Sequence, residues 1–175
     1  MRHLFIAFIL FLIGGAAYLT VKNGVFLPVH LEIKNAGPFL FWGTDHIGPY
    51  HEVLPSLQKV ENLASQHGLD CKTTFGEYLD DPNIVEVARL RAFVGCVLTK
   101  EPVEISTSVR LSERPIRRYV VGTFHGSPAL GPYKAYGDAA EFMTRRGLQM
   151  DGSVIEIYRM GDDGKMVTEY YFPIR

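Results

Sequence analysis

Cysteine is scarce in this sequence, and its scarcity excludes two kinds of site. The chain has 2 cysteines, Cys71 and Cys96, and they form neither a CxxC pair nor a cluster with histidines. A structural zinc site needs several such ligands at short spacings, and a thioredoxin-type redox site needs CxxC. The two cysteines would pair as a disulfide in an exported protein, but we expect two buried free thiols.

The sequence also lacks an excess of charge of either sign. Lys and Arg number 18 and Asp and Glu 19, so the formal net charge is -1. Proteins that track nucleic-acid phosphates carry a positive excess, so nucleic acid is not an expected partner. We find no low-complexity tract, cofactor motif or metal-ligand spacing, and expect no cofactor and no metal. The 175 residues, 47% of them hydrophobic, suffice for one domain with a core.

An uncharged run over residues 4–21 sets the amino terminus apart from the rest of the chain. As a helix rising 1.5 Å per residue, this run would measure roughly 27 Å, about one hydrocarbon core. We therefore expect residues 1–22 to be a single-pass membrane anchor, on an undecided side of the membrane. The alternative is a cleaved signal peptide, because Gly15-Ala16-Ala17 offers small residues for the peptidase, and the exported protein would then be soluble.

Residues 38–175 contain one order of elements twice. Each half has a strand, a Gly-Pro-Tyr tripeptide, a helix and two further strands. In the first half these elements are expected at residues 38–48, 48–50, 55–67, 71–81 and 91–98. In the second half the strand is expected at 115–126 and the tripeptide at 131–133, at the beginning of a helical segment that runs to 147. The two further strands are expected at 153–160 and 165–174, with a Gly-Asp-Asp-Gly hairpin turn between them. The matching order predicts a duplication.

The predicted fold class is α+β. One helix and three strands are too little to close a core, so two pseudo-symmetric βαββ modules should form one antiparallel sheet whose two helices flank a groove. Residues 23–37 are expected to be a linker between this domain and the amino-terminal transmembrane helix. Residues 99–114 should join the modules, with an added strand over ISTSVRL at 105–111.

Several short motifs resemble the GyrI-like family of gyrase-inhibitory, SOUL-related small-molecule-binding domains. FGEYLDDPNIVEVARLRAFVGCVL at 75–98 has Tyr-x-Asp-x-Pro, then Leu-Arg and a Gly-containing strand; AYGDAAEFMTRRGL, IEIY and TEYYFPI follow in the family's order. The resemblance covers residues 38–175. The hydrophobic leader and EYLDDPNIV resemble the membrane-anchored branch that includes the endoplasmic-reticulum autophagy receptor of animals.

The resemblance implies a (βαββ)₂ fold whose interhelical groove holds small cationic or aromatic organic molecules. Members of the family serve as effector-binding domains of transcription regulators, as a gyrase inhibitor and as hydrolases of cyclopropane-bearing toxins. No helix-turn-helix segment precedes the domain, so a regulator acting alone is not expected.

Glu169 is the main candidate site residue. Strand alternation in VTEYYFP places it on one face with Tyr171, and the family pattern puts the carboxylate of this strand at the floor of the groove. A carboxylate among aromatic rings is costly to bury unless a cation meets it, which suits a positively charged ligand. It is also the candidate general base. The alternative is a structural salt bridge to Arg117 or Arg118.

The other predicted ligand-binding residues are aromatic. Tyr78 and Tyr158 occupy corresponding strands, Tyr136 lies at a module corner, and Trp42 lies in the first strand. Such rings form cages around organic cations, although core packing would also explain each of them. Glu156 shares a face with Tyr158, and with the Glu169 pair it offers an acid and a base.

The sequence therefore predicts a membrane-tethered GyrI-like domain that binds a small aromatic or cationic organic molecule. The alternatives are a hydrolase of electrophilic, cyclopropanoid-type molecules and a membrane adaptor or receptor with an unknown protein partner. No residue is assigned a catalytic role beyond Glu169 as a candidate base.

Overall fold

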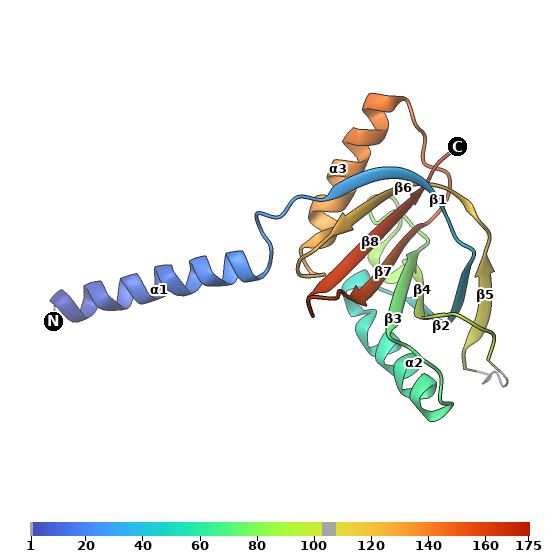
Figure 1. Ribbon diagram of the computed structural model, residues 1–175, viewed down its shortest axis with the longest axis horizontal. Helices are drawn as coiled ribbons and strands as arrows, with labels where there is room; N and C mark the ends of the chain where they lie inside the picture. The colour runs from blue at the N-terminus through green and yellow to red at the C-terminus, as the bar shows by residue number, and fades with distance from the viewer. Residues whose placement is uncertain (1, 103–107) are drawn as a thin grey trace.

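A computed structural model describes residues 2–102 and 108–175 and shows an α+β fold (Figure 1). Its helices are α1 (Arg2–Lys22), α2 (Leu54–Gln66) and α3 (Gly131–Arg146), with short 3₁₀ turns η1 (Tyr50–Glu52) and η2 (Val87–Arg89). Its strands are β1 (His30–Ala36), β2 (Phe39–Ile47), β3 (Thr73–Tyr78), β4 (Arg91–Leu98), β5 (Arg110–Arg114), β6 (Arg117–Phe124), β7 (Val154–Met160) and β8 (Met166–Pro173). The helix and strand positions of both predicted modules are confirmed to within a few residues.

The strands form one open antiparallel sheet in the order β1-β6-β8-β7-β3-β4-β2-β5. The first module contributes β2, α2, β3 and β4, and the second contributes β6, α3, β7 and β8. The order β6-β8-β7 is mirrored by β3-β4-β2, so the modules meet where β7 pairs with β3. This junction is where two βαββ modules related by a pseudo-two-fold axis must join.

Two edge strands extend the sheet beyond the modules. β1 lies inside the segment expected to be a linker, and it pairs with β6. The residues before it are also docked: the Ser127 N–H donates to the Asn23 carbonyl at 3.1 Å. β5 pairs with β2 and confirms an added strand between the modules, although residues 105–107 of the predicted strand lie outside the described residues. Both modules thus depend on strands outside the repeat to cover their edges.

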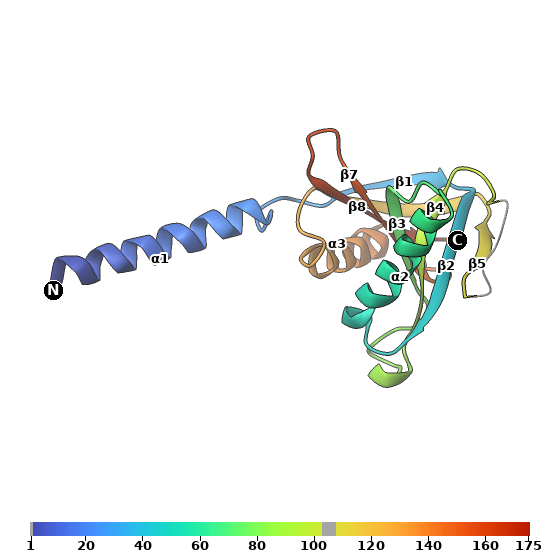
Figure 2. The same cartoon turned by 90° about the horizontal axis from the view of Figure 1, so that it is seen from below.

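The sheet buries side chains on both faces. Helices α2 and α3 lie on one face, the helix face (Figure 2). The core between α3 and the sheet is formed by Ala135 and Ala139 of the helix with Val120, Tyr170 and Phe172 of the strands. The core between α2 and the sheet is formed by Val60 and Ala64 of the helix with Trp42, Cys96 and Leu98 of the strands. The opposite or inner face carries Phe41, Phe75, Phe93, Tyr119, Val121, Ile155, Ile157 and Tyr171. The sheet curls around this inner face, since Phe39 of β2 meets Tyr171 of β8 with ring centroids 5.2 Å apart.

The two Gly-Pro-Tyr tripeptides begin different structures. Pro132 lies in the first turn of α3, where its missing N–H costs little. The first tripeptide runs into η1, whose first residue is Tyr50, and η1 supplies the additional residues before α2 begins. Both helices end alike, at a left-handed glycine (Gly68 or Gly147) followed by a leucine whose N–H bonds the carbonyl five residues back.

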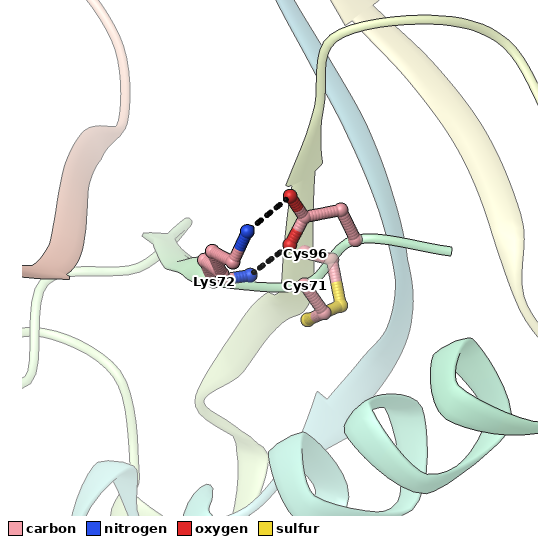
Figure 3. Close-up of a disulfide and its surroundings, with 4 residues drawn as sticks. Cys71, Lys72 and Cys96 are labelled. Carbon is pink, nitrogen blue, oxygen red and sulfur yellow. Dashed lines mark hydrogen bonds and ion pairs between the residues drawn. A yellow bond between two sulfur atoms is a disulfide. The ribbon is translucent and has the colours of Figure 1, made fainter. Parts of the chain in front are cut away.

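Cys71 and Cys96 form a disulfide, so the prediction of two free thiols is wrong (Figure 3). Cys71 lies just before β3, and Cys96 lies in β4, which pairs with β3 so that Thr74 faces Cys96. This pairing brings the two Cα atoms to 5.1 Å, inside the range that a disulfide requires. The bridge therefore ties the beginning of β3 to the strand beneath α2.

The apolar amino-terminal run forms α1, which extends away from the sheet (Figure 1). Within the described part of the chain, no helix combines the length and apolar character needed to cross a membrane. The membrane anchor expected over residues 1–22 therefore lacks support from the structure, and the predicted localisation stays a prediction.

Candidate functional site

The two central strands of the sheet lie between the helices. Helix α2 packs mainly on β4 and β2, and α3 packs mainly on β6, β1 and β8. The helix-face residues of β3 and β7 therefore form an interhelical strip at the junction of the modules. Its members are Thr74, Gly76, Tyr78, Val154, Glu156 and Tyr158.

Glu156 occupies the centre of the interhelical strip. Only 3% of this residue is exposed. The Tyr136 hydroxyl, from α3, donates to Oε1 at 2.9 Å, and the Tyr158 hydroxyl, from the same strand, donates to Oε2 at 2.7 Å. Both carboxylate oxygens thus have a phenol partner, and no ion pair to Glu156 is found among the described residues.

Burial raises the pKa of the Glu156 carboxyl to about 7, although the hydrogen bonds from Tyr158 and Tyr136 act to lower it. Burial also raises the pKa of the Tyr78, Tyr136 and Tyr158 hydroxyls, and the charge of Glu156 adds to this rise. These phenols stay neutral near pH 7, so Glu156 is the group in the cluster that titrates there.

Two more tyrosines complete the surroundings of the acid. The Tyr78 and Tyr158 hydroxyls lie 3.2 Å apart, and the ring of Tyr50 meets the edge of Tyr78 at 4.8 Å. The Tyr50 hydroxyl is held by backbone on both sides: it donates to the Asp80 carbonyl at 2.8 Å and accepts from the Asp80 N–H at 3.0 Å. Asp80 in turn forms a two-point ion pair with Arg91. Turn η1 therefore positions a ring at the edge of the strip.

A glycine makes room for this arrangement. Gly76 pairs directly with Glu156 across the module junction. A Cβ at Gly76 would lie 3.0 Å from the Tyr78 hydroxyl oxygen, so the Tyr78 ring lies over this glycine. Gly76 of the first module and Glu156 of the second are equivalent positions, so the site has one acid instead of two.

The second buried carboxylate, Glu77, shows how this protein normally neutralises such a group. Glu77 lies on the inner face with 4% exposure. Arg114 donates to both of its oxygens, at 3.0 and 2.5 Å, and the Ser153 hydroxyl donates at 2.8 Å. Glu77 therefore has a guanidinium partner, whereas the partners of Glu156 in the described part of the chain are phenols.

The structure brings together three of the residues predicted to bind a ligand: Tyr78, Tyr136 and Tyr158 all surround Glu156. Trp42 does not join them, because it is fully buried beneath α2, in a strand separated from β7 by β3 and β4. Its indole Nε1 has no hydrogen-bond partner among the described residues. Tyr133, from the second tripeptide, is 87% exposed and does not join the site either.

Glu169 and Tyr171 are not part of this group either. Tyr170 and Phe172 of β8 pack beneath α3, so alternation turns Glu169 and Tyr171 to the inner face. There the Tyr171 hydroxyl donates to Glu169 at 3.0 Å, and the partner cation is Arg159, at 3.9 Å, instead of Arg117 or Arg118. The structure thus separates Glu169 from Glu156 by the thickness of the sheet, and a ligand-binding role for Glu169 stays a prediction.

Sequence reasoning gave Glu156 only a secondary role and did not include Tyr50 in the site. The signal for Glu156 lies in the repeat itself. When the modules are aligned on Tyr78 and Tyr158, Glu156 falls opposite Gly76, so one module has an acid where the other has no side chain. Tyr50 ends the first Gly-Pro-Tyr tripeptide, but this local pattern does not show that its ring reaches Tyr78.

Comparison with known proteins places this arrangement in a family. The model of the GyrI-like small molecule binding domain matches residues 30–175. The chain therefore belongs to the GyrI-like family, and the domain class is one that binds small molecules. A comparison with curated proteins found no match. Nothing in the comparisons supports a membrane-anchored branch or a resemblance to the autophagy receptor.

Solved structures with low identity share the fold. The EcmrR–DNA complex in EcmrR-RPo is 16% identical with a TM-score of 0.65, covering 99% of this chain and 67% of that chain. SAV2435 bound to tetraphenylphosphonium is 10% identical with a TM-score of 0.54, covering 83% and 94%. A hydrolase encoded by lin2189 from Listeria innocua is 15% identical with a TM-score of 0.57, covering 89% and 98%. The absence of a nucleic-acid partner for this chain stays a prediction.

Proposed function

We propose that this domain binds a small aromatic organic cation at the interhelical strip, with Glu156 as the counter-charge. The observation that carries the proposal is that Glu156 is buried among tyrosines and lacks a basic partner in the described parts of the chain. An unpaired buried carboxylate is unstable, and a cation that reaches it gains a strong charge-assisted interaction. The free energy lost in burying this acid is recovered when the ligand binds.

The aromatic surroundings favour a cation that is large and weakly hydrated. Rings of Tyr78, Tyr136 and Tyr158 lie around the acid, and the ring of Tyr50 packs against that of Tyr78. Aromatic faces attract cations and also bury apolar substituents, so a quaternary or phosphonium centre with aryl groups matches both features. The similar structure of SAV2435 is described as bound to tetraphenylphosphonium, a cation of this kind.

Tyr136 is the residue that a ligand must displace. It is 37% exposed, whereas Glu156 behind it is buried, and its hydroxyl bonds the acid directly. The incoming cation replaces a neutral donor with a full positive charge, which strengthens the interaction with the carboxylate. Helix α3 carries Tyr136 and thereby forms one wall of the site.

Titration with tetraphenylphosphonium tests the proposal. The wild-type protein should bind it saturably, with an increase in melting temperature. Glu156→Gln should weaken binding at least about 30-fold, because it removes the charge–charge attraction between the carboxylate and the phosphonium, worth roughly 2 kcal/mol or more at a buried site. Isothermal titration calorimetry at pH 8, where Glu156 is ionised, measures the affinity.

Glu169→Gln is the matched control, since it removes one carboxylate from the same sheet but from the inner face. Its affinity should equal that of the wild type. Loss of binding in Glu169→Gln with normal binding in Glu156→Gln would refute the proposed site and move it to the inner face. No saturable binding by any variant would end the proposal of cation binding.

A second function is favoured by the titration of Glu156, since a carboxyl with a pKa of about 7 is suited to general-base catalysis near neutrality. In a hydrolysis, Glu156 would take a proton from water while the water oxygen bonds to an electrophilic carbon. A tyrosine hydroxyl would give its proton to the leaving group and recover one from Glu156. One structural neighbour is described as a hydrolase.

Turnover of activated esters and cyclopropane-bearing electrophiles distinguishes catalysis from binding alone. A hydrolase should show a rate that rises with pH through about 7 and falls about 100-fold or more in Glu156→Gln. Equal rates in the wild type and in Glu156→Gln would rule out this role of the acid.

A further inference from the structure

Two fully buried hydroxyls beside Glu156 have no hydrogen-bond partner among the described residues. They are the Thr168 Oγ1 and the Tyr170 hydroxyl, both in β8 and both in residues with 0% exposure. Burial raises the pKa of the Tyr170 hydroxyl, and hydrogen bonding from Thr168 acts to lower it, so the two hydroxyls are neighbours. Within the described residues, however, neither hydroxyl has a partner at the distance and angle of a full hydrogen bond. A buried hydroxyl without a hydrogen-bond partner destabilises the free protein, and a bound ligand that supplies the partner would explain why it is present.

Both hydroxyls lie on the helix face next to the proposed site. In the β7–β8 pairing, Tyr170 is opposite Glu156 and Thr168 is opposite Tyr158. The Tyr136 ring meets the Tyr170 ring at a centroid distance of 6.3 Å. Tyr136 thus bonds Glu156 and packs against the Tyr170 ring, so its displacement frees the part of the helix face that adjoins both residues.

The Tyr170 hydroxyl also faces the beginning of α3. A Cβ at Gly131 would overlap this hydroxyl, so only glycine fits against it there. The cap position, Leu130, provides no side-chain hydrogen bond, and Pro132 has no N–H to offer. Phe172 lies two residues further along β8 on the same face and packs in the same core cluster. Apolar packing alone therefore does not require a tyrosine at position 170.

We propose that Tyr170 and Thr168 form a hydrogen-bonding subsite for the ligand, adjoining Glu156. This inference rests on the proposed function. The ligand class is then an organic cation that also carries a hydroxyl, carbonyl or ether oxygen on an aromatic substituent. The positive centre of the ligand meets Glu156. The ligand oxygen accepts a hydrogen bond from the hydroxyls of β8, and a ligand hydroxyl is also able to donate one to them.

A pair of probes that differ by one hydroxyl tests the subsite. Tetraphenylphosphonium has a positive centre and no hydroxyl, and (4-hydroxyphenyl)triphenylphosphonium has the same centre with one hydroxyl on one of its rings. The wild type should bind the hydroxylated probe about 5- to 10-fold more tightly, the ratio expected for one hydrogen bond. Tyr170→Phe and Thr168→Val should each lower that ratio, and Tyr170→Phe should bring it below about 2-fold.

Urea unfolding of Tyr170→Phe without ligand shows whether the Tyr170 hydroxyl serves ligand binding or stabilises the free protein. Removing a hydroxyl that has no partner breaks no bond, so the urea midpoint should be equal to or higher than that of the wild type. A lower midpoint together with an unchanged probe ratio would show a structural role and overturn the inference.

Tyr133→Phe is the matched control, because it removes a phenol from an exposed position of α3. It should change neither the probe ratio nor the midpoint. Equal affinities of the wild type for the two probes, with tetraphenylphosphonium still bound in a Glu156-dependent manner, would refute the subsite alone. Failure of both probes to bind would refute cation binding and the subsite with it.

Discussion

Replacing Glu156 by Gln should make the free protein more stable at pH 8, by about 3 kcal/mol. The pKa of Glu156 rises from its usual value of 4.5 to about 7 in the folded protein, chiefly through burial. Each tenfold change in the acid dissociation constant corresponds to about 1.4 kcal/mol of stability that the ionised acid removes. Glutamine keeps the shape of the side chain and carries no charge, so it removes this penalty.

The raised pKa also predicts how stability changes with pH. Between pH 4.5 and about 7 the folded protein holds a proton on Glu156 that the unfolded chain has released, so stability falls as pH rises through this window and then levels off. The facing groups Tyr78, Tyr136, Tyr158 and Tyr170 have raised pKa values and stay neutral there. In Glu156→Gln the stability should not show this fall between pH 4.5 and about 7.

Urea unfolding at pH 5, 6, 7 and 8 measures both effects. The difference between Glu156→Gln and the wild type should be small at pH 5 and largest at pH 8. A saturating cation should shift the wild-type profile toward the variant's stability, because it stabilises the ionised form. A variant less stable than the wild type at pH 8 would mean that the carboxylate is adequately paired, and would contradict the account of Glu156 given above.

Removing the disulfide should lower the free energy of unfolding by about 3 kcal/mol. Cys71 and Cys96 are 25 residues apart, and chain-entropy arguments assign roughly that amount to a loop of this length. Alanine is the suitable replacement, because Cys96 is fully buried and a serine hydroxyl there would add a polar group to the core.

The variants Cys71→Ala, Cys96→Ala and the double variant form a complete set. Each single change already breaks the bridge, so all three should lose similar stability in urea unfolding, and the losses should not add. Tetraphenylphosphonium binding should persist in all three, since the bridge lies at the other end of β3 from Tyr78. Additive losses, or a double variant within about 1 kcal/mol of the wild type, would contradict a stabilising bridge.

The elements of the fold could be predicted because their signals are local. Two-residue alternation marks a strand, and a glycine at a left-handed φ ends α2 and α3 at Gly68 and Gly147. The hairpin turn over Gly161–Gly164 is likewise formed by the residues at that place. The repeated order of such signals was enough to predict the two modules and the antiparallel sheet.

The choice of the central acid could not be predicted in this way. Glu156-Ile157-Tyr158 and Glu169-Tyr170-Tyr171 have the same Glu-x-Tyr pattern on neighbouring strands. Alternation shows that each pair shares a face, but it does not show which face the helices cover. The preference for Glu169 came from the family resemblance, which places the carboxylate of the last strand at the floor of the groove, whereas in the structure Glu169 lies on the inner face with Arg159.

The sequence by itself determined the order of elements, the duplication and the membership of a small-molecule-binding family. Each element rests on a local pattern, and the duplication and the membership rest on the order of these patterns along the chain. Tertiary structure alone decided which carboxylate lies among Tyr78, Tyr136 and Tyr158, whether the two cysteines pair, and which buried hydroxyls lack a hydrogen-bond partner within residues 2–102 and 108–175. Those outcomes depend on strand register and on where helices pack, and contacts between residues tens of positions apart set both.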